Sequence, residues 1–286
     1  MVTHVAADDC GVLRPDASGS VVETHHEAPD EELDRRPIDS HATIVCMRLY
    51  KFLSKEFALK SMRERRCKIS RLSQMNDPFE MFPFDLTHIV ARVALTTTLE
   101  TMDLIAGAMC FSKEWSNPVI WAHYADQHRG ICLGFDVPDE NVQAITYTGQ
   151  REPFPDFNAL SADEALAAMN RILFTKFADW AYEKEYRVPV KLDWSTITEN
   201  GLLFVEWGDN FKLAEVIVGL RSPTCKRELE RALDGYRESV TFARAAASHD
   251  AFSVVQDDRE LRGCDELVFY RMIGQTYHPL AFVRDI

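Results

Sequence analysis

Apolar and polar positions divide the chain into strand-like and helix-like segments from residue 43 onward. The β-rich apolar run 43–52 predicts a first strand, and Ser54 is placed to cap a helix that continues to about Arg65. Apolar residues close to a helical period predict a long helix over 87–108. Alternating or continuous apolar runs predict further strands at 67–72, 108–112, 130–136, 144–147, 185–192 and 211–220.

Residues typical of helix starts and helix ends mark a further helix in the middle of the chain. Asn117 is a suitable N-cap, Pro118 stands at the first helical position, and Gly130 lies just beyond the expected end. This order of start and stop residues predicts a helix over 118–128.

Two more helices are expected in the second half of the chain. One covers 161–177, and the other begins at Ser222 as N-cap and ends near Tyr236. Strands and helices do not alternate regularly, and neither G-x-G-x-x-G nor G-x-x-x-x-G-K occurs. We therefore expect one α+β domain, with a mixed or antiparallel central sheet flanked by helices.

The first 42 residues are rich in acidic side chains and carry no lasting hydrophobic period. Such a segment cannot bury enough apolar surface to offset the entropy cost of ordering it. We expect a disordered acidic tail over 1–42 and a single folded domain over 43–286. The net charge of -13 argues against broad binding to nucleic acid or anionic lipid, but it is compatible with a small basic pocket.

Cysteine usage and hydropathy favour a cytoplasmic location. The 7 cysteines are scattered and no C-x-x-C pair occurs, so we expect reduced thiols, with neither a disulfide framework nor a zinc site. No apolar run reaches the roughly 18 to 20 residues of a membrane-spanning helix, and the N-terminus lacks a signal-peptide pattern. We expect no association with membranes.

Residues 76–80, with the sequence Asn-Asp-Pro-Phe-Glu, form the first of three site-like motifs. Asn76 and Asp77 favour a turn because their side chains bond to nearby backbone, and the proline that follows restricts the turn angle. The turn can therefore aim Phe79 and Glu80 into a site. The alternative is a purely structural loop.

The second motif lies on the helix expected over 118–128. Trp121, Tyr124 and His128 share one face at i, i+3 and i+7, and His123 lies on a neighbouring face. These rings either pack the helix into the core or place Tyr124 or His123 in a ligand pocket, where an amphipathic ring gives both stacking area and a hydrogen bond.

The third motif is the segment 182–187, with the sequence Tyr-Glu-Lys-Glu-Tyr-Arg. Strand alternation would place Glu183, Glu185 and Arg187 on one face, with the two carboxylates about 7 Å apart. One carboxylate can then stay ionised and stabilise a developing positive charge while the other positions a nucleophile. The alternative is a solvated strand edge.

Neither a metal centre nor a serine-hydrolase site is indicated. His123, Asp126 and His128 are the only local candidates for metal ligands, and His128 is turned away from the other two. A Ser-His-Asp arrangement stays open, but no G-x-S-x-G sequence occurs.

The three motifs carry a resemblance to a known family. Matching segments are Leu49-Tyr50-Lys51-Phe52, 76–80, Cys110-Phe111-Ser112, 121–126, 128–135, Lys176, 180–187 and 216–220. In order and spacing they resemble a bacterial family catalogued as domain of unknown function 2971, across roughly residues 47–222. The family name implies no activity.

A more distant likeness is to the ADP-ribosyltransferase-like fold. In that fold a first strand with a cationic or polar residue, a second motif with an aromatic residue or a serine, and a late glutamate surround the nicotinamide end of NAD. Lys51, then Ser112 or Tyr124, then Glu183 or Glu185 stand at those points in that order.

The first strand departs from the usual pattern, because it has Tyr50 and Lys51 where such enzymes usually have Arg or His. The likeness implies that the chain cleaves the nicotinamide–ribose bond of NAD and that Glu185 stabilises the positive charge that develops on the ribose. Tyr124 would stack on nicotinamide, and Lys51 or Arg187 would hold phosphate. NAD is then a substrate, and no further cofactor is implied.

The expected site is the sum of these assignments. Glu185 and Glu183 are the expected catalytic residues, and the expected substrate-binding residues are Tyr50, Lys51, Asn76, Asp77, Phe79, Glu80, Ser112, Trp121, His123, Tyr124 and Arg187. The expected partner is a small nucleotide.

Two other classes of function stay open. One is a hydrolase or nuclease that uses His123, Asp126 and the two glutamates, with metal-dependent activity. The other is a non-enzymatic sensor or antitoxin-like binding protein in a defence or toxin–antitoxin setting, in which the same cluster holds a ligand or a protein partner.

Overall fold

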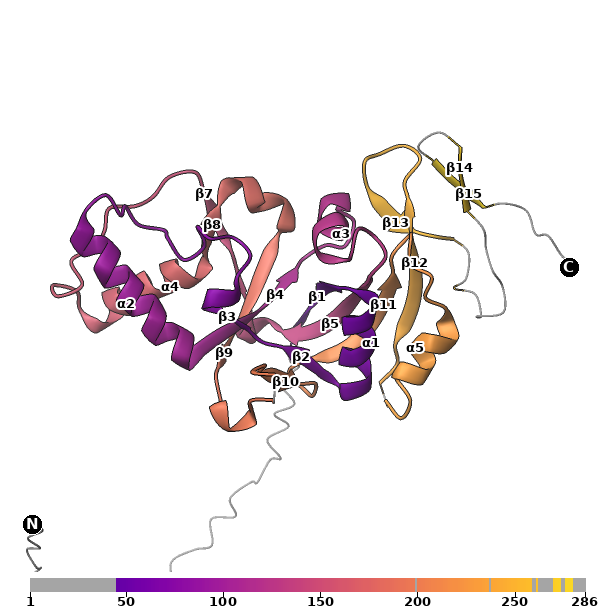
Figure 1. Cartoon of the computed structure of the whole chain (residues 1–286), viewed down its shortest axis with the longest axis horizontal. Helices are drawn as coiled ribbons and strands as arrows, with labels where there is room; N and C mark the ends of the chain where they lie inside the picture. The colour runs from indigo at the N-terminus through magenta and orange to yellow at the C-terminus, as the bar shows by residue number, and fades with distance from the viewer. Residues whose placement is uncertain are drawn as a thin grey trace, which may run out of the picture. The chain divides into compact units, whose positions relative to one another are not determined.

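A computed structural model describes residues 45–198, 200–236, 238–258, 261, 270–273 and 276–279 (Figure 1). The acidic tail expected over 1–42 lies outside the described residues. The first elements are β1 (Cys46–Leu53), α1 (Lys55–Glu64), β2 (Arg66–Lys68), β3 (Ser70–Arg71), η1 (Leu72–Gln74), α2 (Ile89–Ile105) and β4 (Ala106–Ser112). The expected cap of α1 is confirmed, since Ser54 Oγ accepts a hydrogen bond from the backbone N–H of Phe57 at 3.3 Å.

The central part of the chain contains both confirmed and corrected elements. They are α3 (Pro118–Tyr124), β5 (Ile131–Pro138), η2 (Asp139–Asn141), β6 (Gln143–Ala144), β7 (Thr146–Thr148), α4 (Ala162–Phe174), β8 (Thr175–Phe177), η3 (Ala178–Glu183) and β9 (Glu185–Lys191). The helix expected to continue through residue 177 ends at Phe174, because Thr175 is extended and β8 pairs in parallel with β7.

Helix α3 is shorter than the predicted range 118–128. Asn117 caps it as expected, with Oδ1 accepting from Val119 N at 2.8 Å, but the helix ends at Tyr124. Asp126, Gln127 and His128 have positive φ values of 45°, 53° and 70°, a left-handed backbone that cannot continue a right-handed helix.

His128 therefore does not lie on α3, although its ring still stacks on that of Trp121 at 6.3 Å with an interplanar angle of 8°. The turn that carries it packs tightly against β1. A Cβ atom added at Gly130 would lie 2.1 Å from the backbone oxygen of Leu53.

The last described elements are η4 (Trp194–Thr196), β10 (Phe204–Glu206), β11 (Lys212–Val218), α5 (Lys226–Ala232), β12 (Thr241–Ala247), β13 (Val254–Gln256), β14 (Tyr270–Ile273) and β15 (Thr276–Pro279). The helix predicted from Ser222 to Tyr236 is wrong at both ends. The Ser222 hydroxyl lies 2.9 Å from that of Thr224 within a turn, and α5 begins only after Cys225.

The thiol prediction is confirmed for three of the described cysteines and wrong for one. Cys67, Cys110 and Cys132 are free thiols, whereas Cys225 is disulfide-bonded.

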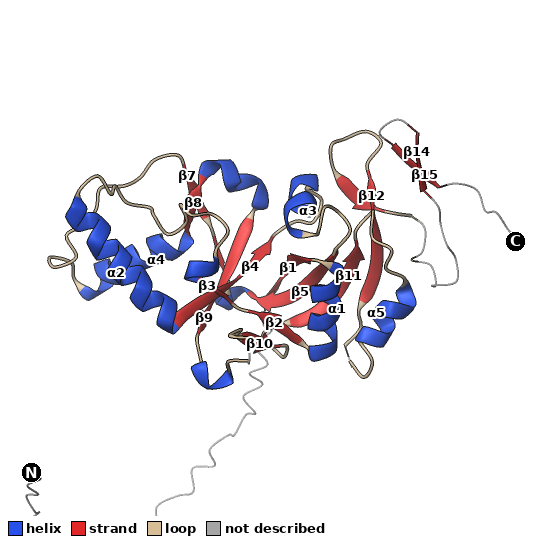
Figure 2. Ribbon diagram, viewed as in Figure 1, coloured by secondary structure: helices blue, strands red, loops and turns tan. Residues whose placement is uncertain are grey.

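The central sheet has the strand order β13-β12-β11-β5-β1-β4-β9-β6, with β3 paired to β4. Figure 2 shows strands of this sheet in red and the helices in blue. Strands β11 and β12 are parallel, and the other described pairs of this sheet are antiparallel. The expected α+β class and the mixed central sheet are thus confirmed.

Helices cover the two faces of this sheet. Residues of α1 and α5, including Met62 and Leu229, share one buried cluster with Leu49 of β1. On the other face Trp121 of α3 packs edge-on against Phe52 at 5.1 Å. Side chains of β1 alternate between these faces because strand geometry has a period of two. None of the helices that the structure describes is long and apolar enough to span a membrane.

Strands β1 and β4 are neighbours along a single residue pair, Tyr50 and Ser112. On its other side β1 pairs with β5 through eight residue pairs, from Cys46 to Leu53. The short β1–β4 pairing lets the two strands separate, and the separation opens the sheet for a cavity.

Candidate functional site

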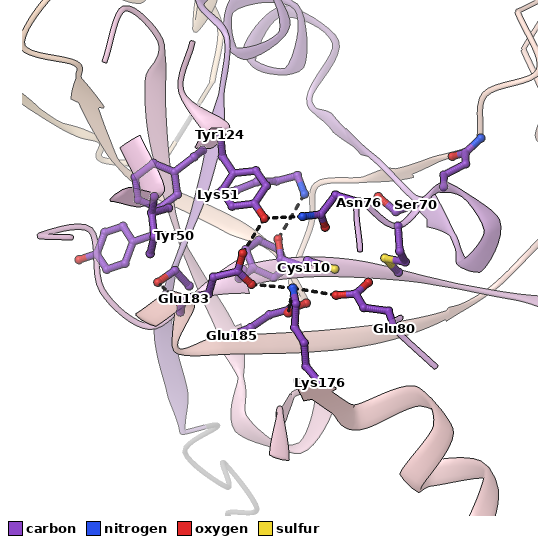
Figure 3. Close-up of a pocket in the computed structure, with 16 residues that line it drawn as sticks. Tyr50, Lys51, Ser70, Asn76, Glu80, Cys110, Tyr124, Lys176, Glu183 and Glu185 are labelled. Atoms are coloured by element: carbon purple, nitrogen blue, oxygen red, sulfur yellow. Dashed lines mark hydrogen bonds and ion pairs between the residues drawn. The ribbon is translucent and has the colours of Figure 1, made fainter. Parts of the chain in front are cut away.

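A cavity of about 250 Å³ lies where β1 and β4 separate (Figure 3). Strand β1 contributes Lys51, β4 contributes Cys110 and Ser112, and α3 contributes Tyr124. Charged side chains from the 76–80 turn, β8, η3 and β9 also line it, namely Glu80, Lys176, Glu183 and Glu185. Residues of the three sequence motifs therefore meet in one place, although Asn76 and Glu185 are 109 residues apart in the chain.

Lys176 is the centre of a buried charge cluster. Its side chain is 2% exposed, and its Nζ lies 2.7 Å from Glu80 Oε1, 2.6 Å from Glu183 Oε2 and 3.1 Å from Glu185 Oε2. Burial alone would lower the pKa of Lys176, but the adjacent carboxylates, Glu185 foremost, raise that pKa above its ordinary value. Lys176 is therefore held as a cation.

Arg187 on β9 is the second cation of the cluster, and its side chain is 1% exposed. Its Nε donates to Glu185 Oε1 at 2.7 Å, its Nη2 donates to Glu80 Oε1 at 3.0 Å, and its Nη1 donates to Leu173 O at 2.7 Å. Three glutamates surround two cations, so the cluster has a formal net charge of one negative unit.

Glu183 and Glu185 reach Lys176 by a different route from the predicted strand alternation. Glu183 is the last residue of η3, Lys184 has a left-handed φ of 44°, and β9 begins only at Glu185. Within β9, Glu185 and Arg187 do share a face as expected. The left-handed turn at Lys184 brings Glu183 back to the same ammonium group.

Glu185 and Glu80 differ in how burial and neighbours affect them. Burial alone would raise the pKa of Glu185, but Arg187 and Lys176 outweigh burial and hold that pKa below its ordinary value. For Glu80, burial is the larger effect, and its pKa is raised despite the same two cations. Glu80 Oε2 is buried and has no hydrogen-bond partner among the described residues.

Tyr124 forms the wall of the cavity opposite Lys176. Its hydroxyl donates to Glu183 Oε1 at 2.5 Å and accepts from Asn76 Nδ2 at 2.8 Å. Burial first, and the hydrogen bond to Glu183 second, raise the pKa of Tyr124. The phenol is therefore a hydrogen-bond donor at neutral pH.

Lys51 is the cation of this cavity that lies outside the cluster. Its Nζ donates to the backbone oxygen of Cys110 at 3.3 Å and lies 5.4 Å from the centre of the Phe111 ring. It forms no ion pair with an acidic side chain of the described chain. A ligand anion would meet a positive charge there.

Two other predicted residues line the cavity with their polar groups already bonded. The hydroxyl of Tyr50 donates to Glu215 at 3.2 Å, and that of Ser112 donates to the Glu183 backbone oxygen at 2.7 Å. Both hydroxyls therefore hold the strands in place.

Four predicted site residues lie away from this cavity. Trp121 is fully buried and donates to Trp115 O at 2.6 Å, so it packs the core. His123 lies outside, with Nδ1 3.1 Å from the hydroxyl of Tyr182. Asp77 accepts from the backbone N–H of Phe79 at 2.9 Å and holds the turn.

Phe79 itself is 65% exposed and lines a different cavity. Asp126, the proposed partner of His123 in a hydrolase site, is exposed and lies 3.8 Å from Arg129. Within the described part of the chain, no three His, Cys, Asp or Glu side chains are grouped to hold a metal ion. The glutamates of the cluster enclose an ammonium group instead.

Lys176 is not among the site residues expected from the sequence. The sequence feature that points to it is a single lysine within a mainly apolar segment. A lysine that is buried at such a position requires anionic partners. The predicted helix over 161–177 concealed that signal, because β8 and not α4 carries this side chain.

Fold and site define an α+β protein whose cavity is built around a buried cluster of glutamates, a lysine and an arginine. Residues 120–188 match the family model described as "Protein of unknown function (DUF2971)". This match supports, over that segment, the resemblance seen in the motifs. The segment includes Tyr124, Lys176, Glu183, Glu185 and Arg187.

The family description states no activity. No curated protein and no solved structure matched the chain.

Proposed function

We propose that this chain is an enzyme that cleaves the nicotinamide–ribose bond of NAD. The observation that carries the proposal is a register across three neighbouring strands. Tyr50 of β1 lies opposite Ser112 of β4, and Ser112 lies opposite Glu185 of β9. The three strands carry the points of the ADP-ribosyltransferase-like pattern in its order, with Lys51, the neighbour of Tyr50, at the first point. Lys51, Ser112 and Glu185 all line the same cavity.

The two carboxylates support different roles in this chemistry. Cleavage builds positive charge on the ribose, so a fixed negative charge lowers the barrier more than it stabilises the bound substrate. Glu185 suits that role because its two cationic neighbours keep its pKa low. Glu183, which bonds to Tyr124 and Lys176, would position the attacking nucleophile.

The size and walls of the cavity support a ligand that is only partly enclosed. A volume of about 250 Å³ is below the range of roughly 300–1,000 Å³ that encloses most of a drug-sized ligand. The cavity would hold the nicotinamide and ribose, with the ring of Tyr124 against the nicotinamide. Lys51 would receive a phosphate at the open side.

The test is incubation of the purified chain with NAD and measurement of free nicotinamide. Glu185→Gln should lower the rate by about 100-fold or more, the scale of losing one preorganised charge. The variant should still fold, because the cluster becomes formally neutral and both cations keep a carboxylate partner, and a melting curve establishes this; its melting temperature should fall, because Glu185 pairs with both buried cations.

Glu114→Gln is the matched control. Glu114 pairs with Lys184 at 2.6 Å, but both side chains are about half exposed and lie outside the cavity, so its rate should equal that of the wild type. Absence of nicotinamide release by the wild type, or an undiminished rate in a folded Glu185→Gln variant, would overturn the proposal.

A further inference from the structure

A second cavity, of about 330 Å³, lies beside the first, and Lys176 lines both. Its aromatic lining comes from Phe79, Phe82 and Phe177, and the turn after β7 adds Arg151. This turn is closed by Thr148, whose Oγ1 accepts from Gln150 N at 3.1 Å. The nicotinamide chemistry proposed above does not use this cavity.

Two phenylalanine rings of this cavity are exposed to solvent. Phe79 is 65% exposed and Phe177 is 49% exposed, and both line the same cavity, so together they give an aromatic surface that a ligand can contact. Both rings belong to segments with well-defined backbone contacts. The N–H groups of Phe79 and Glu80 bond to Asp77, and β8 pairs with β7.

The same two segments supply the charges of the first cavity. Glu80 follows Phe79 and is drawn to Lys176 and Arg187, while Phe177 follows Lys176 in β8. Phe79 lies in the turn closed by Asp77, and Phe177 lies in β8, so each ring is next in sequence to a member of the charge cluster and lines the second cavity.

We infer that the second cavity binds the planar base of an adenine nucleotide, stacked on Phe79 and Phe177. Every base has a π-face that stacks on an aromatic side chain, and such stacking needs no base-specific hydrogen bond. The guanidinium of Arg151, exposed at the rim near Asp85, would contact the phosphate. The choice of adenine rests on the proposed function, because a dinucleotide has a second base to place.

The test is a calorimetric titration of the purified chain with AMP. Phe79→Ala and Phe177→Ala should each bind AMP about tenfold more weakly, since loss of one stacking ring is of that size. Phe252→Ala is the matched control: Phe252 is fully exposed and lies outside both cavities, so its affinity should be unchanged. Melting curves would establish that all three variants fold.

Wild-type affinity retained by the folded Phe79→Ala and Phe177→Ala variants would overturn the inference, as would the absence of AMP binding at millimolar concentration. The two proposals fail separately. AMP binding that depends on the two rings, without nicotinamide release, would sustain the second cavity and reject NAD cleavage. Nicotinamide release with an unchanged KM in Phe79→Ala would do the reverse, because a lost contact to a remote base should raise KM and leave kcat unaltered.

Discussion

Replacement of Lys176 by methionine tests the buried charge cluster most directly. The substitution keeps the length and apolar stem of the side chain and removes one ammonium group. Glu80 and Glu185 then keep Arg187 as their one cationic partner among the described residues, and the formal charge of the cluster changes from one to two negative units. Glu183 loses its ion pair, because its other side-chain bond is to the neutral Tyr124 hydroxyl.

The size of the expected loss of unfolding free energy follows from the burial of these groups. Lys176 and Glu80 are each 2% exposed, and Glu183 is 7% exposed. Breaking a buried ion pair by removal of one partner costs about 3–5 kcal/mol of unfolding free energy. Lys55→Met is the control, because Lys55 pairs with Glu228 at 2.8 Å but both side chains are about one-third exposed. Loss of such a pair costs about 0–1 kcal/mol.

The assay is equilibrium urea denaturation near pH 7, followed by far-ultraviolet circular dichroism. Tryptophan fluorescence is less suitable, because Lys176 lies 4.9 Å from the centre of the Trp180 ring and its removal changes the local signal. A double variant, Lys176→Met with Glu80→Gln, removes one carboxylate as well. It should recover part of the loss, since charges in one network couple by about 0.5–3 kcal/mol. The cluster is refuted as a buried unit if Lys176→Met costs no more than Lys55→Met, or if the double variant loses stability additively.

Two further predictions concern backbone packing and pH. Gly130→Ala should lower the unfolding free energy by at least about 1–3 kcal/mol, because its Cβ would lie 2.1 Å from Leu53 O. Gly208→Ala is the control, because a Cβ at Gly208 meets open space and should have little effect. Equal urea midpoints for the two variants would contradict this packing. The pKa of Glu80 is raised in the folded chain above its ordinary value of 4.5. Between these two pKa values the folded chain binds more protons than the unfolded chain. The unfolding free energy therefore falls as pH rises through that window. Glu80→Gln should flatten this fall in melting temperature, and an unchanged slope would show that another group causes it. Glu185 acts in the opposite sense, because its lowered pKa gives stability that is lost only as pH drops below 4.5.

Elements with local signals were predictable. The Ser54 cap of α1, the Asn117 cap of α3 and the strand at 185–192 are confirmed, because caps and alternation depend on residues a few positions apart. The ends of α3 and α5 were not predicted. Three left-handed residues after Tyr124, and a turn closed by Ser222 and Thr224, replace the expected last and first helical turns.

The candidate site was predictable in its parts more than in its arrangement. Glu183, Glu185 and Tyr124 were expected near one another, and Tyr124 indeed bonds to Glu183 while Lys176 joins the two glutamates. Trp121 was expected on the same face as Tyr124, but it packs inward to Trp115 and Phe52. The helical period shows which side chains of α3 share a face, but it does not show which face lines the cavity.

The sequence by itself determined the α+β class, the positions of most strands and helices, and three motifs rich in side chains that support chemistry. The tertiary structure alone decided that β1 and β4 separate, that Lys176 lies among three glutamates, and that Phe79 and Phe177 line a second cavity. Local signals depend on interactions within a few residues, whereas the cluster joins side chains from Glu80 to Arg187. A buried charge is stable only where distant segments bring its partners, and no local pattern records that requirement.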